Sequence, residues 1–580
     1  MSIVVNPRNK LYTGPELELK NKTTDPETSP RDGYSIELIC GSAVIDLLLN
    51  PGFQKSWDML FESCPWATVF QSRAFITACY QVYREVHIPI IVSAMEGGQL
   101  KGLLPMALLN TNPDNYHVAG KNGRITGPGH YEAEYQTWLA APSDAESFIK
   151  KALAEIMKEF PGHHISFRFL PAGTPLDWIK EDNAWRKCCI VQDYDLPVIS
   201  FKDPEPAQIF KRKHFKNKLN RLKKFGEVHF ETITNLERFK SIFDELILLY
   251  DFRQNALFNK LPFYADPVKK DFLLELFRLN MLHVTLLRAD EKTIAAVVAV
   301  KGLNGAVHLA GMNCHSPFKA RSYSPGFIHF ILLAKQLSEE HVSYFDLSPG
   351  YDAYKDDLAN EHVVVKELVI TTERAFHLKR KIRNWIHARL IAAGKRPMSV
   401  ELDLKRYLYL FRHCNTKFLI KRLAKSLGKK GKQQLYGIQP DQLPSNVKTS
   451  FQKDNLSDLL DIEPGKGTGV TRWEFMGDAM YRLETGQHAF TWVENGRLLC
   501  CAWFKYPDNS VAENDNKPAA ETAIVLESCY YEGEGKDRLA DLVNSVVTDI
   551  ADKKEGVPVY FRASDPLFCK ALQLAGSQIA

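Results

Sequence analysis

Tyr344-Phe-Asp-Leu-Ser-Pro-Gly-Tyr-Asp-Ala-Tyr-Lys-Asp-Asp-Leu358 is the stretch that decides the fold of this chain. The segment Ser324 to Leu337 before it predicts a helix, because proline stands near its start and apolar residues follow at three-to-four spacing. Residues 341–346 predict a short strand. Ser-Pro-Gly at 348–350 then turns the chain out of the sheet, because proline cannot donate to a strand and glycine adopts positive φ. Open α/β sheets bind their ligands at such strand ends.

Length and composition limit the class of protein. At roughly 150 residues per domain, 580 residues predict three or four units. Hydrophobic residues make up 45% and charged residues 25%, which is typical of a globular protein, and no apolar run approaches the ~20 residues that span a bilayer. The N-terminus shows no secretory signal, and the 11 cysteines have neither disulfide nor metal-ligand spacing. We therefore expect a cytoplasmic protein without a metal.

One order of elements recurs along the chain. Residues 1–33 are polar and predict a disordered arm. Residues 34–200 predict helices, a hairpin with a Gly-Gly turn, a strand, a helix and a further strand, and residues 201–373 repeat that order. Residues 464–580 predict a smaller third copy with an Asn-Gly hairpin turn. The predicted fold class is α/β, with tandem units of mixed sheets flanked by helices.

Residues 374–463 predict a basic helical connector followed by a polar linker. Lys and Arg dominate its first part, 374–432, where Glu401 and Asp403 are the only acidic residues. The same helical patterns carry apolar residues such as Trp385, so the helices are amphipathic. Three interpretations stay open: a solvated connector, a docking surface for anionic lipid, or a nucleic-acid surface.

The loop 317–326 before the helix is a candidate phosphate site. A helix N-terminus offers unpaired N–H groups to an anion, and Lys319 and Arg321 add positive charge. Ser324 adds a polar group, and Gly326 allows close approach of the backbone. The equivalent loop of the third unit carries Glu532 and Glu534, which repel phosphate. An ordinary turn is the alternative for either loop.

These patterns together resemble the GNAT acyltransferase fold. The run Phe345 to Lys355 is similar to the Phe-Asp-(Leu/Phe)-(Ser/Thr)-x-Gly-x-x-x-Tyr-Lys signature of CelD-like acyltransferases. Cys64 to Ser72 resembles the opening segment of that family, and Arg212 to Gly226 resembles its basic helix. The resemblance covers roughly residues 34–372. Such proteins look like relatives of the Fem-type aminoacyltransferases, which pair two GNAT units and hold the substrate in the groove between them.

The resemblance implies acyl-CoA, for example acetyl-CoA, as co-substrate. Direct attack on a thioester needs a polarised carbonyl, a base for the nucleophile and an acid for the leaving thiolate. Tyr354 is the candidate acid, and Asp346 is a candidate base or orienting carboxylate, although each has a purely structural alternative in packing or capping the turn. Further candidates are Lys355 for an anion, His315 as a second base, Met312 and Asn313 on the pantetheine-pairing strand, and Asp251, Arg253 and Tyr351 for substrate.

We therefore expect an enzyme that moves an acyl group from acyl-CoA to an amine or hydroxyl of a cell-envelope or exopolysaccharide precursor. We expect it to be cytoplasmic, and peripheral contact with an anionic inner membrane through 374–432 is one of the interpretations left open. Two alternatives keep the fold: an aminoacyl-tRNA donor, with RNA held by the basic helices, or a non-catalytic, membrane-docked scaffold. Hydrolase chemistry is disfavoured because no Gly-x-Ser-x-Gly elbow occurs in the sequence.

Overall fold

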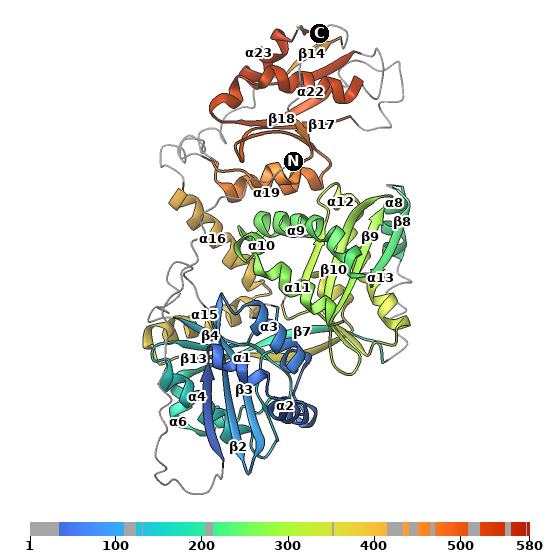
Figure 1. Ribbon diagram of the computed structural model, residues 1–580. Coiled ribbons are helices and arrows are strands. Elements are labelled where there is room, and N and C mark those ends of the chain that lie inside the picture. Colours follow the sequence, from blue (N-terminus) through green and yellow to red (C-terminus); the bar gives the residue numbers. More distant parts are fainter. Residues whose placement is uncertain are drawn as a thin grey trace.

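The computed structural model describes residues 34–109, 123–129, 132–202, 213–224, 226–350, 353–413, 433–439, 451–464, 470–507, 523–551, 558–575 and 577–579. The predicted arm, 1–33, lies outside these ranges. Within them the strands form one sheet of thirteen strands and one of seven, both flanked by helices (Figure 1). The predicted fold class is confirmed.

The first unit follows the predicted order. Its elements are β1 (Ser35–Cys40), α1 (Ser42–Leu48), α2 (Pro51–Ser63), α3 (Arg73–Val82), β2 (His87–Glu96), β3 (Gln99–Leu109), β4 (Arg124–Thr126), β5 (Leu139–Ala140), α4 (Ala145–Glu159), β6 (His164–Leu170), α5 (Trp178–Glu181), α6 (Asn183–Cys188) and β7 (Cys189–Ser200). The turn between β2 and β3 holds Gly97 and Gly98 at φ 54° and 79°, as a two-residue hairpin requires. Asn50 starts α2 by accepting a 3.0 Å hydrogen bond from the N–H of Phe53.

The second unit repeats this order. Its elements are α8 (Lys213–Lys223), β8 (Val228–Ile233), α9 (Leu236–Phe258), α10 (Pro262–Ala265), α11 (Val268–Arg278), β9 (Leu282–Ala289), β10 (Lys292–Lys301), β11 (Ala306–His315), α12 (Ala320–Tyr323), α13 (Pro325–Glu339), β12 (Tyr344–Asp346), α14 (Ala353–Leu358) and β13 (Glu361–Ile370). Ser348 and Gly350 adopt φ 63° and 146° in the turn after β12. The chain therefore leaves the sheet where the sequence predicts.

The two units exchange their last strands. In the first unit β6 pairs with β13 of the second unit, and in the second unit β12 pairs with β7 of the first. The exchanged strands β7 and β13 pair with each other over the whole of β13, from Cys189 opposite Ile370 to Val198 opposite Glu361. The predicted boundary between the units, at residue 200, follows β7. This strand belongs to the first unit by sequence but lies between β12 and β13 of the second unit. One continuous sheet results.

Helices also cross the seam between the units. Phe75 of α3 and Phe272 of α11 meet edge to face, with ring centroids 5.6 Å apart. The Tyr83 hydroxyl donates a 3.0 Å hydrogen bond to Asp266. Beside them Lys269 forms an ion pair with Glu132, and both side chains are buried. The two units thus share apolar, hydrogen-bonded and charged contacts.

The C-terminal unit is larger than the sequence predicts. Its elements are β14 (Gln434–Ile438), β15 (Gln452–Lys453), α18 (Leu456–Leu460), α19 (Arg472–Glu484), β16 (His488–Glu494), β17 (Arg497–Lys505), β18 (Ile524–Tyr531), α22 (Leu539–Ala551), β19 (Val559–Ala563), α23 (Pro566–Leu574) and β20 (Gln578–Ile579). Residues 433–463, expected to be linker, thus carry β14, β15 and α18. The alternating Tyr436 and Ile438 are each 1% exposed, and so short a strand lacks a strong sequence pattern.

The C-terminal unit packs against the second unit through α19. Met476, Met480 and Leu483 of this helix are buried in the same core as Phe252 of α9. Figure 1 shows α19 (orange) lying along α9 (green). The C-terminal unit therefore packs on the second unit through an apolar interface.

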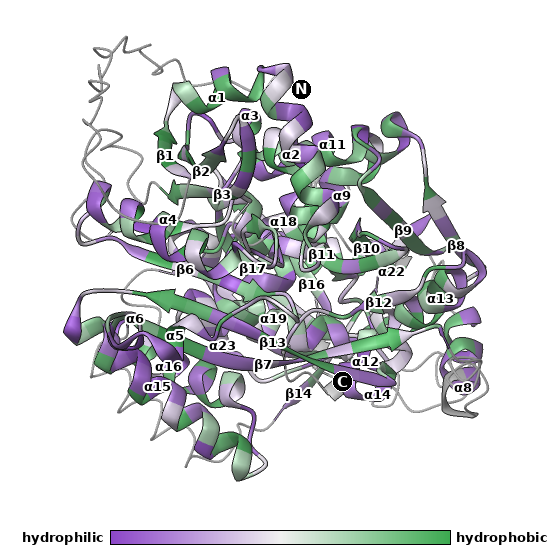
Figure 2. Cartoon of the chain, turned by 90° about the horizontal axis from the view of Figure 1, so that it is seen from below, coloured by the Kyte–Doolittle hydropathy of each residue, from purple (hydrophilic) through white to green (hydrophobic). Residues whose placement is uncertain are grey.

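Two helices form the predicted basic connector. They are α15 (Arg374–Ala392) and α16 (Pro397–His413), and residues 414–432 lie outside the described ranges. In Figure 2 the two helices lie at the edge of the molecule. Across the part of the chain that the structure describes, no helix is both long and apolar enough to cross a bilayer.

Candidate functional site

The strands β11 and β12 separate at the centre of the second unit. They pair in parallel only from Ala306 opposite Tyr344 to His308 opposite Asp346. There β12 ends, whereas β11 continues to His315, so its remaining backbone has one edge that β12 does not cover. Peptide groups on such an edge are available to a ligand.

A bulge interrupts β11 directly after His308. Its pairing with β10 jumps from Val298 opposite Met312 to Val300 opposite His308. Gly311 lies in this bulge at φ 115°, where a Cβ atom would stand 2.7 Å from the carbonyl oxygen of Val298. Only glycine fits, and the bulge redirects backbone groups away from the ladder.

Three donors converge on the carboxylate of Asp346, which is 1% exposed. Its Oδ2 accepts hydrogen bonds from the Tyr135 hydroxyl at 2.5 Å and from His308 Nδ1 at 2.8 Å. Its Oδ1 accepts from the N–H of Ser348 at 2.7 Å. A carboxylate only accepts, so His308 carries a proton on Nδ1, and the lone pair of the neutral imidazole is then on Nε2. Asp346 therefore orients a histidine, a role left open by the sequence.

The cluster joins both units. Tyr135 comes from the first unit, whereas His308 and Asp346 come from the second. Burial, followed by the nearby charge of Asp346, raises the pKa of Tyr135 well above its ordinary value. The phenol thus remains a donor at every physiological pH.

A second buried charge cluster lies beside the first. Glu134 is 2% exposed, with Arg168 Nη2 3.5 Å from its Oε2. Burial raises the pKa of Glu134, while Arg168 and Lys355 oppose that shift. Lys355 itself is buried and donates a 2.9 Å hydrogen bond to the carbonyl of Ser348. The predicted Lys355 thus braces the turn beside Asp346 rather than lying in solvent.

A cavity of about 280 Å³ opens at the seam next to Asp346. Strands β7 and β13 contribute residues such as Val198 and Val363, and the second unit contributes His308, Tyr344 and Asp346. The first unit contributes further residues of the lining, Pro65, Trp66, Ala67, Thr68, Tyr135, Pro171 and Ala172. We call this space the seam cavity. Its volume is near the lower end of small-molecule sites.

Tyr354 does not line the seam cavity. Its ring stacks on Phe330 of α13, with centroids 5.5 Å apart. Tyr351, the neighbouring substrate-binding candidate, lies outside the described residues. The predicted acid therefore faces a helix, and its catalytic role stays a prediction.

The candidates at the far end of β11 form a separate group. Burial, then Arg253, lowers the pKa of His315 to about 4, so this imidazole is neutral at pH 7. A Cβ atom on Gly326 would lie 3.4 Å from its Nδ1, which places the start of α13 against this ring. Met312 is buried, and Asn313 follows it in the ladder opposite Val297. These residues cluster with one another, away from Asp346.

The candidate substrate-binding residue Asp251 caps the N-terminus of α10. Its two carboxylate oxygens accept hydrogen bonds, each 3.2 Å long, from the N–H groups of Phe263 and Tyr264 at the start of α10. Burial raises its pKa. A carboxylate used in this way caps a helix.

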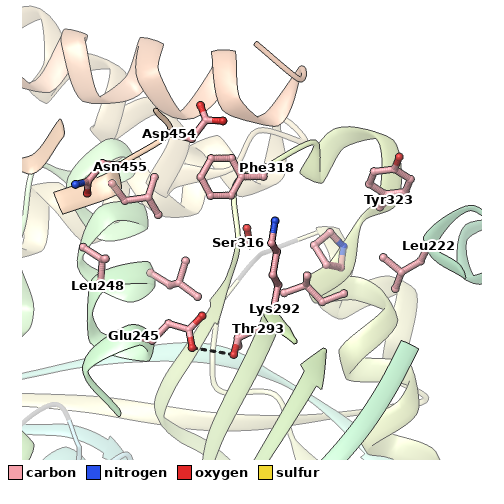
Figure 3. Close-up of a pocket in the computed structure, with 14 residues that line it drawn as sticks. Leu222, Glu245, Leu248, Lys292, Thr293, Ser316, Phe318, Tyr323, Asp454 and Asn455 are labelled. Carbon is pink, nitrogen blue, oxygen red and sulfur yellow. Dashed lines mark hydrogen bonds between the residues drawn. The ribbon is translucent and has the colours of Figure 1, made fainter. Parts of the chain in front are cut away.

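A second cavity, of about 330 Å³, lies at the predicted phosphate loop (Figure 3). Figure 3 shows the Lys292 side chain standing within the ring of lining residues, close to Ser316 and Phe318. Glu245 accepts a 3.0 Å hydrogen bond from the Thr293 hydroxyl. The remaining residues of the lining are Leu222, Leu248, Leu249, Ile294, Tyr323, Pro325, Asp454, Asn455 and Leu456. We call this space the loop cavity.

Two residues of the predicted phosphate loop contact the C-terminal unit, Arg321 through its side chain and Lys319 through its backbone. Arg321 Nε lies 3.1 Å from Glu484 Oε2, and its guanidinium stands over the ring of Tyr481. The N–H of Lys319 donates a 2.8 Å hydrogen bond to the carbonyl of Leu483. Ser324 adopts a left-handed conformation before α13. Lys319 and Arg321 therefore contact α19 of the C-terminal unit, and Lys292 is the lysine beside the loop cavity.

Sequence patterns missed Tyr135, His308, Glu134 and Lys292. His308 lies in a strand of mostly apolar residues and looks like part of the core. One signal was present: Glu132, Glu134 and Gln136 alternate in a short segment and are all buried. Alternating polar residues that are buried indicate an internal network.

Comparisons with known proteins support the fold. Residues 210–356 match the family model described as an acetyltransferase (GNAT) domain. No curated protein matches the sequence. The GNAT part of the predicted resemblance is thus confirmed for these residues, and the CelD-like part stays a prediction.

Several solved structures are similar at low identity. FemX is 8% identical with a TM-score of 0.38, and the match covers 56% of this chain and 97% of FemX. L-PGS from Bacillus licheniformis is 10% identical with a TM-score of 0.36, covering 59% and 97%. A tandem GNAT protein from the clavulanic acid biosynthesis pathway is 11% identical with a TM-score of 0.34, covering 58% and 99%. At these values the similarities identify no activity or substrate for this chain.

Proposed function

We propose that this chain is an acyltransferase whose reaction takes place between the β11 bulge and the seam cavity. The observation that carries the proposal is the hydrogen bond of 2.8 Å from His308 Nδ1 to the buried Asp346, directly before the bulge. A histidine held in this way presents Nε2 as a general base, and a strand edge that ends at a bulge offers N–H groups to a carbonyl oxygen.

The reaction is a direct transfer. The donor thioester lies along the uncovered edge of β11, where backbone N–H groups polarise its carbonyl. An amine or hydroxyl in the seam cavity attacks, and His308 Nε2 takes its proton. The new carbon–nitrogen or carbon–oxygen bond forms as the carbon–sulfur bond breaks, and the thiolate takes the proton from His308. Asp346 stabilises the imidazolium that forms on the way.

Acyl-CoA is the proposed donor, and a cell-envelope or exopolysaccharide precursor is the proposed acceptor. The match of residues 210–356 to acetyltransferases supports the donor, and the CelD-like run from Phe345 to Lys355 supports the acceptor. One observation counts against a CoA phosphate at the expected loop, because Arg321 is paired there with Glu484, and an aminoacyl-tRNA donor is kept as the alternative. The two donors are therefore compared directly.

The test measures release of CoA from acetyl-CoA with glucosamine and other small amines as acceptors. His308→Gln is expected to lower kcat by roughly 10²–10⁴ while acetyl-CoA binding, measured by calorimetry, stays within about twofold. The matched control is His362→Gln, because His362 Nδ1 also lies 2.8 Å from a carboxylate, that of Asp195, but on the surface.

Two outcomes contradict the proposal. Turnover of His308→Gln equal to that of His362→Gln excludes His308 as the base. If the protein binds and turns over aminoacyl-tRNA but no CoA species, acyl-CoA is excluded as the donor and aminoacyl-tRNA takes its place.

A further inference from the structure

The connector helix α15 exposes most of its apolar residues and turns mainly charged residues inward, although Phe376 stacks on His164. Its inward side is charged: Arg380 pairs with Glu367, and Arg383 Nε lies 2.7 Å from Glu401 Oε1. His387, also on this side, reaches the same carboxylate at 2.5 Å. Amphipathic helices of globular proteins normally turn their apolar side inward. The apolar side of α15 is therefore left for another partner.

The outward side of α15 is an apolar stripe. Leu378, Ile382, Trp385 and Ile386 follow at spacings of four, three and one, which places them on one face. Their exposed fractions range from 43% to 61%. Solvent-facing residues of this size normally occur singly.

Helix α16 carries a second stripe of the same kind. Val400, Leu404, Tyr407, Leu408 and Phe411 follow at spacings of four, three, one and three. Their exposed fractions range from 39% to 68%. Both helices lie at the edge of the molecule, where Figure 2 shows apolar and polar residues mixed along α15.

The same two helices are strongly basic. Residues 374–413 contain 11 Lys and Arg residues against two acidic residues, Glu401 and Asp403. Glu401 is already paired with Arg383 and His387. Lys379, Lys381 and Arg389 are exposed beside the α15 stripe. An exposed apolar surface is thus framed by positive charge.

We propose that α15 and α16 bind the surface of an anionic phospholipid bilayer. The two apolar stripes enter the boundary between headgroups and acyl chains, and the surrounding Lys and Arg contact lipid phosphates. A nucleic acid accounts for the charge but leaves aliphatic residues such as Leu378 and Leu404 without a role. A second copy of the chain accounts for the apolar stripes but brings two basic surfaces together.

The test is cosedimentation of the full chain with vesicles. Partitioning is expected to be at least tenfold stronger into phosphatidylcholine vesicles with 30% phosphatidylglycerol than into pure phosphatidylcholine, and to fall with salt. Trp385→Glu combined with Phe411→Glu is expected to lower it at least tenfold, and Lys381→Gln about fivefold. Tyr264→Glu is the matched control, because Tyr264 on α10 is 81% exposed but lies outside the stripes.

Three results overturn the proposal. They are equal partitioning of the double variant and Tyr264→Glu, tighter binding of a 20-nucleotide RNA than of anionic vesicles, and dimerisation that the double variant abolishes. Thermal melting of each variant verifies folding, because none of these exposed positions contributes to the core. Acyl-CoA turnover without vesicles stays unchanged in the double variant, so failure here is distinguishable from failure of the proposed chemistry.

Discussion

Replacing Lys269 by Met is expected to destabilise the seam between the two units strongly. The Lys269 and Glu132 side chains are 8% and 9% exposed and form an ion pair across the seam. Burial lowers the pKa of Lys269, but Glu132, Tyr250 and Asp266 together outweigh burial, so that the pKa is raised. Met preserves most of the volume, so the change is chiefly a loss of charge.

The expected loss of unfolding free energy comes from the carboxylate of Glu132, which stays buried without its partner. Removing one partner of a buried ion pair costs ~3–5 kcal/mol, because the other charge stays buried without compensation. Glu132 then faces Asp266, whose pKa burial and Glu132 already raise. A raised pKa in the folded state means that the penalty is greatest at high pH and shrinks as pH falls through that pKa. The stability difference between the variant and the wild type should therefore shrink as the pH is lowered.

Urea unfolding followed by tryptophan fluorescence measures the effect. Lys269→Met combined with Glu132→Gln removes both charges and is expected to recover at least half of the loss. Lys158→Met is the surface control, since the Lys158–Glu155 pair is 72% and 41% exposed, and it should cost under ~1 kcal/mol. A single variant within ~1 kcal/mol of wild type, or a double variant no more stable than the single, refutes the reasoning.

Two further changes test the site and the core. Gly302→Ala places a Cβ atom 2.4 Å from His308 Nε2 and should displace the imidazole, so its turnover should fall to within tenfold of the turnover of His308→Gln. Gly477→Ala is the control and should stay active, because its Cβ atom meets nothing closer than 3.7 Å. His329 is 1% exposed, and burial lowers its pKa to about 3, so the unfolded state binds a proton first as pH falls below ~6.5. Wild-type stability should therefore fall with acid, and His329→Gln should flatten that slope in urea unfolding between pH 7 and pH 5; equal slopes would exclude His329 as the cause.

Local patterns predicted the local structure well. The turn after Asp346 depends on proline and glycine within a few residues, and Ser348 and Gly350 indeed adopt positive φ there. The hairpin at Gly97 and Gly98 has the same kind of cause. Such features are decided by backbone sterics of adjacent residues, which a sequence displays directly.

Contacts between segments that are distant in the sequence could not be predicted from local patterns. Arg321 reads as free positive charge, yet its partner Glu484 lies 163 positions later on a helix of another unit. Tyr135 and Asp346 meet across 211 positions because two units share a seam. Likewise, the sequence pattern predicts that β7 and β13 are strands. It does not predict which edge of the sheet each strand joins, because every open edge offers the same backbone hydrogen bonds.

The exchange of β7 and β13 has a consequence for synthesis. Translation of the first unit is complete when the ribosome reaches Ser200. The edge of β6 that pairs with β13 stays open until β13 is complete at Ile370. At ~5–20 residues per second the nascent chain waits roughly 10–30 s, during which that edge can recruit a strand from another molecule. A ribosome that stalls in this interval releases an aggregation-prone fragment, so chaperone demand is expected to peak midway through translation.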